Sequence, residues 1–274
     1  MLNRSSLSHG PRSRRAARLA AVALAATACV AAMTGSADAV VNGKDSTERY
    51  PFMATIPQTI KEIDVHAQCG ATLISPRWLV TAAHCVNPEM VDGTVRVGSD
   101  HRTSGGTVRG IKRMIPHPDY SYVTEPSTND IALVELDRPV AQKPIRIADA
   151  VGRPGTPTRL LGFGTVLNTD DLTKAVFPDR LQELNTRIGA VDECSPGRAD
   201  RTRICTVSQV PGAMACFGDS GGPQLQRGRD GRWELVGATS GDGDTDPTCS
   251  TGPGMYTAVP AYAGWIHKTI HTHR

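Results

Sequence analysis

The sequence predicts an all-β fold. Among its 274 residues, 27 glycines and 19 prolines divide the chain into many short segments, and only 4% of the residues are aromatic. Glycine and proline at this density favour strands and turns over long helices. With 21% charged and 39% hydrophobic residues, the composition is that of a globular domain that can bury a core.

Residues 1–39 have the three-part layout of a signal peptide. Five arginines, the last of them Arg18, precede the apolar run Leu19–Met33, and a small-residue site follows at 37–39. The apolar run is about 15 residues long, which is short of the roughly 20 that a membrane-spanning helix needs. We therefore expect a secreted, extracellular protein with no membrane segment in its mature form.

The basic charge of the chain belongs to this leader. The leader carries five arginines and one aspartate, so the formal charge of +3 becomes about −1 without it. A nucleic-acid-binding domain is expected to keep a strong basic excess, so nucleic acid is not an expected partner. The pair Arg14-Arg15 leaves twin-arginine export open beside ordinary export.

Short apolar runs, most of them bounded by Gly, Pro or Asp, are the expected strands. One stretch has a helical period instead, because Val259, Tyr262, Ile266 and Ile270 fall on one helix face. A single closing helix is therefore expected at about 259–270. The expected strands lie at residues 71–74, 78–80, 95–97, 131–136, 159–163 and 235–238.

Cysteine usage favours disulfides. Seven cysteines are present, and Cys29 lies in the leader, so six remain in the exported chain. An even number of cysteines in an oxidising compartment indicates disulfides, and six cysteines allow 15 pairings. Zinc is the alternative, but the sequence has no C-x-x-C pair, and thiols oxidise outside the cell.

Three short segments carry a candidate catalytic site. The segment GDSGGP places Ser220 among glycines, which let the backbone turn tightly and a substrate carbonyl come close. A serine hydroxyl is a weak nucleophile and needs a base, which the segment TAAHC supplies as His84. The segment NDIAL adds Asp130 at the start of an apolar strand, where its carboxylate can orient the base.

In their residues and in their order along the chain, these segments resemble the chymotrypsin/trypsin-like serine protease family. The resemblance runs from Val40 to the C-terminus and is taken to indicate a secreted bacterial member. It implies a protease domain at 40–274, built from two antiparallel six-stranded β-barrels at about 40–150 and 151–258 and the closing helix. It also implies a serine endopeptidase that acts on polypeptides through an acyl-enzyme.

The resemblance implies a role for each site residue. Ser220 is the nucleophile, His84 is the general base, and Asp130 holds the histidine in the productive tautomer. The backbone N–H groups of Gly218 and Ser220 form the oxyanion hole. Ser240 supports Asp130 by a hydrogen bond.

The resemblance also implies a structural role for Asp219. The aspartate at this position in the family pairs with the ammonium group of a newly cut N-terminus. Val40 is the first residue of the segment VVNG, which resembles that N-terminus. A buried carboxylate without a partner is strongly disfavoured, so cleavage would control assembly of the site. Signal removal after Ala39 would itself activate the enzyme, whereas cleavage after Ala37 would leave a dipeptide before Val40.

The resemblance also implies the cysteine pairs and the substrate pocket. The pairs are Cys69 with Cys85, Cys194 with Cys205, and Cys216 with Cys249. Met214 occupies the floor position of the pocket and favours apolar side chains over Lys or Arg. Gly254 keeps one wall open. Asp242 either lies at the pocket mouth, where it recruits a basic residue, or faces solvent.

No metal and no cofactor are expected. Asp242, Asp244 and Asp246 alternate as in a calcium loop, but Pro247 and Pro253 stand where such a loop needs glycine and glutamate. The expected partners are polypeptide substrates and protein inhibitors of proteases, and the expected state is a monomer. The alternative function is a catalytically silent binding or signalling homologue, and an esterase is a second alternative that the chain order His, Asp, Ser disfavours.

Overall fold

Two antiparallel sheets and one C-terminal helix make up the part of the chain that the computed structural model describes, residues 40–123, 127–196 and 198–273. The predicted leader at 1–39 lies outside these residues. All the described residues belong to one compact unit. Among them, no helix has both the length and the apolar character that crossing a membrane requires.

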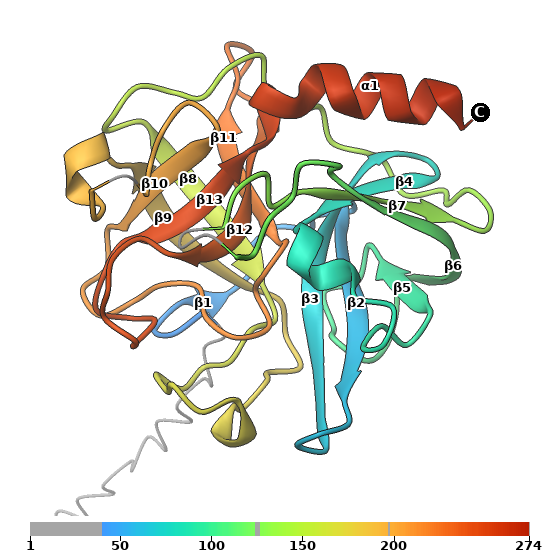
Figure 1. Cartoon of the computed structure of the whole chain (residues 1–274), viewed down its shortest axis with the longest axis horizontal. Helices are drawn as coiled ribbons and strands as arrows, with labels where there is room; N and C mark the ends of the chain where they lie inside the picture. Colours follow the sequence, from blue (N-terminus) through green and yellow to red (C-terminus); the bar gives the residue numbers. More distant parts are fainter. Residues whose placement is uncertain (1–39, 124–126, 197, 274) are drawn as a thin grey trace, which may run out of the picture. The chain divides into compact units, whose positions relative to one another are not determined.

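The first sheet closes into a barrel in the order β2-β3-β4-β7-β6-β5 (Figure 1). Each neighbouring pair is antiparallel. All five residues of β7 are buried, which explains why four of them are apolar. The fifth, Glu135, is a buried carboxylate paired with Lys112 and Arg113. The strands are β2 (Met53–Ile60), β3 (Val65–Ser75), β4 (Trp78–Thr81), β5 (Thr94–Val97), β6 (Thr107–Pro116) and β7 (Ala132–Leu136).

The second sheet also closes on itself, because β8 pairs with β9 as well as with β11. A short seventh strand, β1 (Lys44–Asp45), is added to the outer edge of β9. The six barrel strands are β8 (Pro157–Gly162), β9 (Gln182–Ile188), β10 (Arg203–Ser208), β11 (Pro223–Arg227), β12 (Trp233–Asp242) and β13 (Gly254–Ala258). The predicted fold class, two six-stranded antiparallel barrels with a C-terminal helix, is confirmed.

The C-terminal helix begins later than its apolar period suggests. Residues Val259–Tyr262 form the short 3-10 turn η4, and the α-helix α1 covers Ala263–Thr272. Pro260 lies in the first turn of η4, where a missing N–H is tolerated because the first N–H groups of a helix have no partner within it. The expected apolar face is present: Val259, Tyr262 and Ile266 are buried and Ile270 packs against the core. The remaining 3-10 turns are η1 (Ala83–Val86), η2 (Leu172–Lys174) and η3 (Val191–Glu193).

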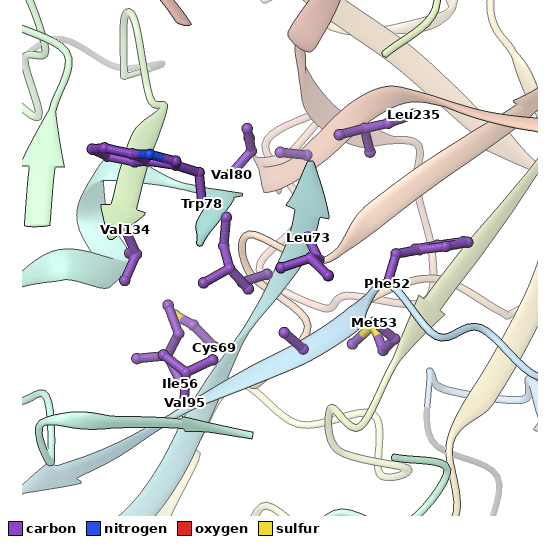
Figure 2. Packing of buried hydrophobic residues seen from close by; sticks show 14 of the residues in the cluster. Phe52, Met53, Ile56, Cys69, Leu73, Trp78, Val80, Val95, Val134 and Leu235 are labelled. Atoms are coloured by element: carbon purple, nitrogen blue, oxygen red, sulfur yellow. The ribbon is translucent and has the colours of Figure 1, made fainter. Parts of the chain in front are cut away.

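The hydrophobic core runs across both barrels. Leu73 of β3 and Leu235 of β12 belong to the same buried cluster, and both are fully buried (Figure 2). Phe52, just before β2, is in that cluster as well. Because one apolar cluster includes side chains from both sheets, the two barrels are packed against each other.

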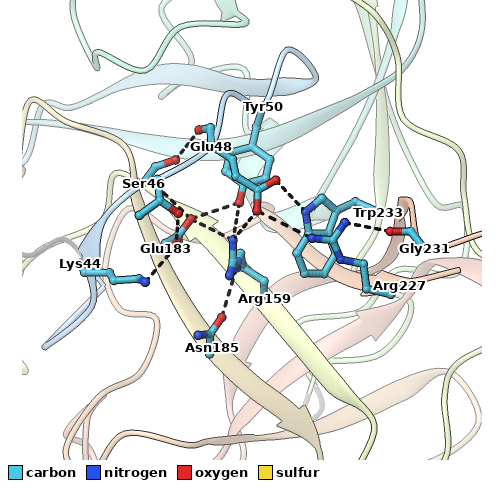
Figure 3. A network of polar contacts seen from close by, with 11 residues as sticks. Lys44, Ser46, Glu48, Tyr50, Arg159, Glu183, Asn185, Arg227, Gly231 and Trp233 are labelled. Atoms are coloured by element: carbon cyan, nitrogen blue, oxygen red, sulfur yellow. Dashed lines mark hydrogen bonds and ion pairs between the residues drawn. The ribbon is translucent and has the colours of Figure 1, made fainter.

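A buried carboxylate holds residues 44–50 against the second barrel. Glu183 of β9 is completely buried, and its oxygens accept hydrogen bonds from Tyr50 Oη at 3.1 Å and Thr47 Oγ1 at 3.0 Å. Lys44 and Arg159 supply its positive charges at 3.3 and 3.2 Å (Figure 3). A charge this deeply buried is tolerated because it is paired and hydrogen-bonded. Residues 44–50 are thereby held against the strand.

Candidate active site

Asp130 lies two residues before β7 and is 2% exposed. Its Oδ2 accepts hydrogen bonds from His84 Nδ1 at 2.9 Å and from Ser240 Oγ at 2.5 Å. Its Oδ1 accepts the backbone N–H of His84 at 3.1 Å. One carboxylate therefore fixes both the backbone and the ring of the histidine and ties them to β12.

The electrostatic interaction between Asp130 and His84 favours a histidine that acts as a base near neutral pH. Burial acts to raise the pKa of Asp130, but the interactions with His84 and the hydrogen bond from Ser240 hold that pKa below its ordinary value. Burial acts to lower the pKa of His84, and the carboxylate of Asp130 outweighs it, so that the net pKa of His84 is raised. Asp130 thus stays ionised while His84 titrates above its usual range.

The backbone before Asp130 is held by contacts that the sequence did not suggest. Asn129 has a left-handed conformation, with φ of 51°. Its side chain donates to the carbonyl of Asp119 at 2.9 Å and accepts from Tyr262 Oη at 3.0 Å. Thr257 Oγ1 donates to the carbonyl of Asp130 itself at 2.7 Å. Residues from the second barrel and from η4 therefore set the position of the carboxylate.

His84 lies in η1 with its side chain 34% exposed, and a disulfide braces it. Cys85, the next residue, is bonded to Cys69 of β3, and its carbonyl accepts from Gln58 Nε2 at 2.8 Å. In the described part of the chain, these two cysteines and His84 are the one cluster with a metal-like spacing. Both sulfurs are already used in the disulfide, so the cluster has no thiolate to offer a metal.

The loop that carries Ser220 packs against the segment that leads to His84. The carbonyl of Ser220 accepts the N–H of Gly70 at 2.7 Å, and the N–H of Gly221 donates to Thr239 at 2.7 Å. Gly221 has φ of 74°, and a Cβ there would collide with Thr81 Oγ1. Only glycine permits this approach, which brings the serine loop to the end of β4, three residues before His84.

The two backbone donors assigned to the oxyanion hole are available. Gly218 has φ of 93°, a conformation that L residues rarely adopt. Within the described residues, neither the N–H of Gly218 nor that of Ser220 donates to another protein group. Two free N–H groups, one on the serine and one two residues before it, are an arrangement that can stabilise a developing oxyanion.

Asp219 points away from Ser220 into the second barrel and is 1% exposed. Its Oδ1 accepts the N–H of Gly164 at 2.8 Å, and its Oδ2 accepts the N–H of Cys216 at 3.0 Å. No cation pairs with it among the described residues, and burial raises its pKa to about 7. Val40 is fully buried in the same cluster as Met214, and Val41 forms a β-bridge with Met214. The segment after the predicted cleavage site is thus already inside the barrel.

The predicted pocket residues line one cavity with Ser220. The cavity has a volume of about 200 Å³, and its lining includes Ser220, Met214, Asp242 and Gly254. A Cβ on Gly254 would lie 3.2 Å from Met214 Sδ and would narrow the opening. Met214 is 2% exposed and adds an apolar side chain to the cavity lining.

Asp242 has features of both expected positions, the pocket mouth and the solvent-exposed surface. It belongs to the pocket lining, yet the residue is exposed to solvent. Desolvation at the pocket mouth and the neighbouring carboxylate of Asp244 raise the pKa of Asp242. Its backbone carbonyl accepts from Arg198 Nη1 at 3.1 Å, so the backbone here is anchored.

The six cysteines are joined in the three pairs that the resemblance implies. The pair Cys216–Cys249 contributes both of its residues to the pocket lining. The pair Cys194–Cys205 packs with Met255 in a separate small cluster. The first and third disulfides therefore lie beside the candidate site, and the second does not.

Comparisons with known proteins agree with this arrangement. A family model described as Trypsin matches residues 40–266. Kallikrein-15 from Homo sapiens is 36% identical over 219 residues, which cover 74% of this chain and 81% of that protein. Kallikrein-11 from Mus musculus is 34% identical and covers 74% of this chain and 73% of its own length.

Two proteins of lower identity match a larger share of this chain. Chymotrypsin-like elastase family member 3B from Macaca mulatta is 28% identical over 85% of this chain and 94% of its own length. The solved structure of neuropsin, a serine protease expressed in the limbic system of mouse brain, superposes with a TM-score of 0.70 at 28% identity. That match covers 84% of this chain and all of the neuropsin chain.

Proposed function

The chain belongs to the trypsin family of serine proteases, and from that premise we propose that it is a secreted endopeptidase with Ser220, His84 and Asp130 as its triad. Membership makes it a serine endopeptidase that acts on polypeptides. The observation that carries the assignment of residues is Asp130, whose carboxylate binds His84 at 2.9 Å and Ser240 at 2.5 Å beside the pocket that Ser220 lines.

The proposed reaction follows from these groups. Ser220 Oγ attacks the scissile carbonyl while His84 Nε2 takes the hydroxyl proton. The carbonyl oxygen becomes an oxyanion bound by the N–H groups of Gly218 and Ser220. The imidazolium then gives its proton to the leaving amine, which leaves an acyl-enzyme at Ser220. Water repeats the sequence with the acyl group and regenerates the serine.

The test is covalent labelling by a fluorophosphonate, followed by mass spectrometry of the labelled peptide. We expect one label per molecule, on Ser220, because only a serine activated by a neighbouring base reacts at a useful rate. Label on a different residue would reassign the nucleophile. A folded wild-type protein that never labels would favour the alternative, a catalytically silent binding homologue.

The pocket supports an apolar preference at the residue before the cut. Met214 lines the pocket with a thioether, and an uncharged side chain cannot compensate the charge of a buried Lys or Arg side chain. We expect chromogenic peptides with Leu or Met at this position to be cleaved at least about tenfold faster than the matched Arg peptide, in kcat/KM. Faster cleavage of the Arg peptide would instead assign substrate recruitment to Asp242.

The N-terminus supports activation by signal removal. Cleavage after Ala39 gives Val40 a free ammonium group, and we propose that this group pairs with Asp219. N-terminal sequencing of the freshly secreted protein should find Val40 first. Finding Asp38 or a longer extension would contradict direct activation.

The mammalian relatives give no support to a bacterial origin, which stays a prediction. The monomeric state and the binding of protein inhibitors also stay predictions.

Unprocessed protein should lose stability as the pH rises from about 4 to 7. Asp219 holds its proton in the folded chain up to a pKa of about 7, whereas the unfolded chain releases it near 3.8. The folded state therefore binds more protons in this window, and its free energy of unfolding falls as the pH increases. Chemical denaturation of a Ser220→Ala protein with and without residues before Val40 measures the effect. The same slope in both forms would contradict an ammonium partner for Asp219.

A further inference from the structure

A glutamine from the first barrel reaches the loop that carries Ser220. Gln68 lies in β3 and is only 4% exposed. Its Nε2 donates a 2.7 Å hydrogen bond to the carbonyl of Phe163, directly after β8. The following residue, Gly164, donates its N–H to Asp219 at 2.8 Å. The side chain of Gln68 is thus bound to a backbone segment that itself holds the residue before Ser220.

Gly218 packs against the same side chain. A Cβ on Gly218 would lie 2.8 Å from Gln68 Nε2 and 2.8 Å from Phe177 Cε1. Real Cβ atoms are not found this close to other heavy atoms, so the amide and the ring fill the space beside Gly218. The peptide that offers one oxyanion donor is therefore backed by Gln68 and Phe177.

Arg102 contacts both Gln68 and Phe177. Its Nη1 donates to Gln68 Oε1 over a long 3.4 Å, and its guanidinium lies over the ring of Phe177, 5.8 Å from the centroid. Burial lowers the pKa of Arg102, and the charge of Asp179 opposes that shift. The guanidinium therefore contacts both groups that pack against Gly218.

The loop that carries Arg102 is fastened to the second barrel. The N–H of Arg102 donates to the carbonyl of Asp179 at 2.7 Å, and the N–H of Leu181 donates to the carbonyl of Asp100 at 2.9 Å. His101 Nδ1 lies 2.6 Å from Asp179 Oδ2. These contacts fix the loop beside residues 179–181, so the backbone of Arg102 has a defined position.

Resting on the proposed function, we infer that Gln68 and Arg102 are positioning residues for the oxyanion hole. They set the position of the Gly218 peptide through the packing of Gln68 and Phe177 against it, and Phe177 transmits the contact from Arg102. An oxyanion donor acts only when it lies about 2.7–3.1 Å from the developing charge. A misplacement of about 1 Å can cost about a hundredfold in rate, so a side chain that backs the donor controls turnover.

The test compares Gln68→Met and Arg102→Met with Arg96→Met. Methionine keeps much of each side chain's shape and removes its hydrogen bonds. Arg96 of β5 is the matched control. Its Nη1 donates to the carbonyl of Gly105, in the loop that carries Arg102, at 2.6 Å, and it forms no hydrogen bond with Gln68. We expect kcat to fall roughly tenfold to a hundredfold for Gln68→Met and roughly threefold to tenfold for Arg102→Met, with KM unchanged and Arg96→Met within about twofold of wild type.

Two inhibitors separate positioning from general damage. A peptidyl trifluoromethyl ketone forms an oxyanion with the serine, and its affinity should weaken in parallel with kcat/KM. A non-covalent peptide that fills the same pocket should bind each variant as it binds wild type. Arg102→Lys, which keeps the charge and a donor, should recover most of the lost rate. Because Arg102 lies nearer the surface, its variants carry the test alone if Gln68→Met does not fold.

The inference is overturned if folded variants keep the wild-type kcat/KM, or if both inhibitors weaken equally. Failure of this inference alone leaves an active wild type with unaffected variants. A wild type that neither labels nor hydrolyses peptides removes the proposed function, and this inference with it.

Discussion

Replacing Ser220 by alanine is expected to lower kcat for a peptide substrate about a millionfold. The variant loses the nucleophile, and His84 and Asp130 have no other hydroxyl to activate, so removing one triad member costs nearly as much as removing all of them. KM should change little, because the pocket of about 200 Å³ keeps the rest of its lining. Initial rates with a chromogenic peptide measure both constants.

Ser104→Ala is the matched control for this change. Ser104 is exposed and its hydroxyl forms no hydrogen bond within the described residues, so this variant should keep wild-type rates and thermal stability. Residual activity of Ser220→Ala above about a thousandth of wild type would require a different nucleophile. The fluorophosphonate label would then locate it.

Asp130→Asn is expected to lower kcat about ten-thousandfold near neutral pH. The amide can donate a hydrogen bond where the carboxylate only accepts, which favours the unproductive tautomer of His84. The change also removes the negative charge that raises the pKa of His84. Two losses therefore combine: the base is turned the wrong way, and its imidazolium is no longer stabilised.

A pH profile distinguishes these effects. In the wild type His84 must be neutral to accept the proton, so kcat/KM should fall as the pH drops through its raised pKa, above the ordinary 6.5. In Asp130→Asn this acid limb should move to lower pH. Asp137→Asn, at an exposed position after β7, should leave the profile unchanged. An unchanged limb in Asp130→Asn would mean that Asp130 does not act on His84.

Much of the fold could be predicted from local pattern. The apolar runs at 78–80 and 95–97 fall inside β4 and β5, because buried strands in a closed barrel need continuous or alternating apolar side chains. The helix was expected four residues too early, because Val259 and Tyr262 follow the same apolar period in a 3-10 turn. Periodicity reports which face is buried, not which hydrogen bonds the backbone makes.

The candidate site shows the same division. Ser220, His84 and Asp130 were selected from residue types and from their order along the chain, and their catalytic roles stay a proposal. Asn129, Tyr262 and Thr257, which hold the backbone of Asp130, gave no sequence signal beyond their polar side chains. Gln68 gave a single weak one, a polar side chain in β3 next to a bridging cysteine.

The sequence by itself therefore predicted an all-β fold and the candidate reacting groups, because these depend on residue types in short segments. The family resemblance added the two barrels and the cysteine pairs. Only the tertiary structure decided how those segments meet: that Asp130 binds His84 and Ser240 together, that Asp219 is buried without a cation in the described chain, and that Gln68 backs Gly218. The physical reason is distance along the chain. Such contacts join residues far apart in sequence, and their energy depends on burial and approach that no local pattern contains.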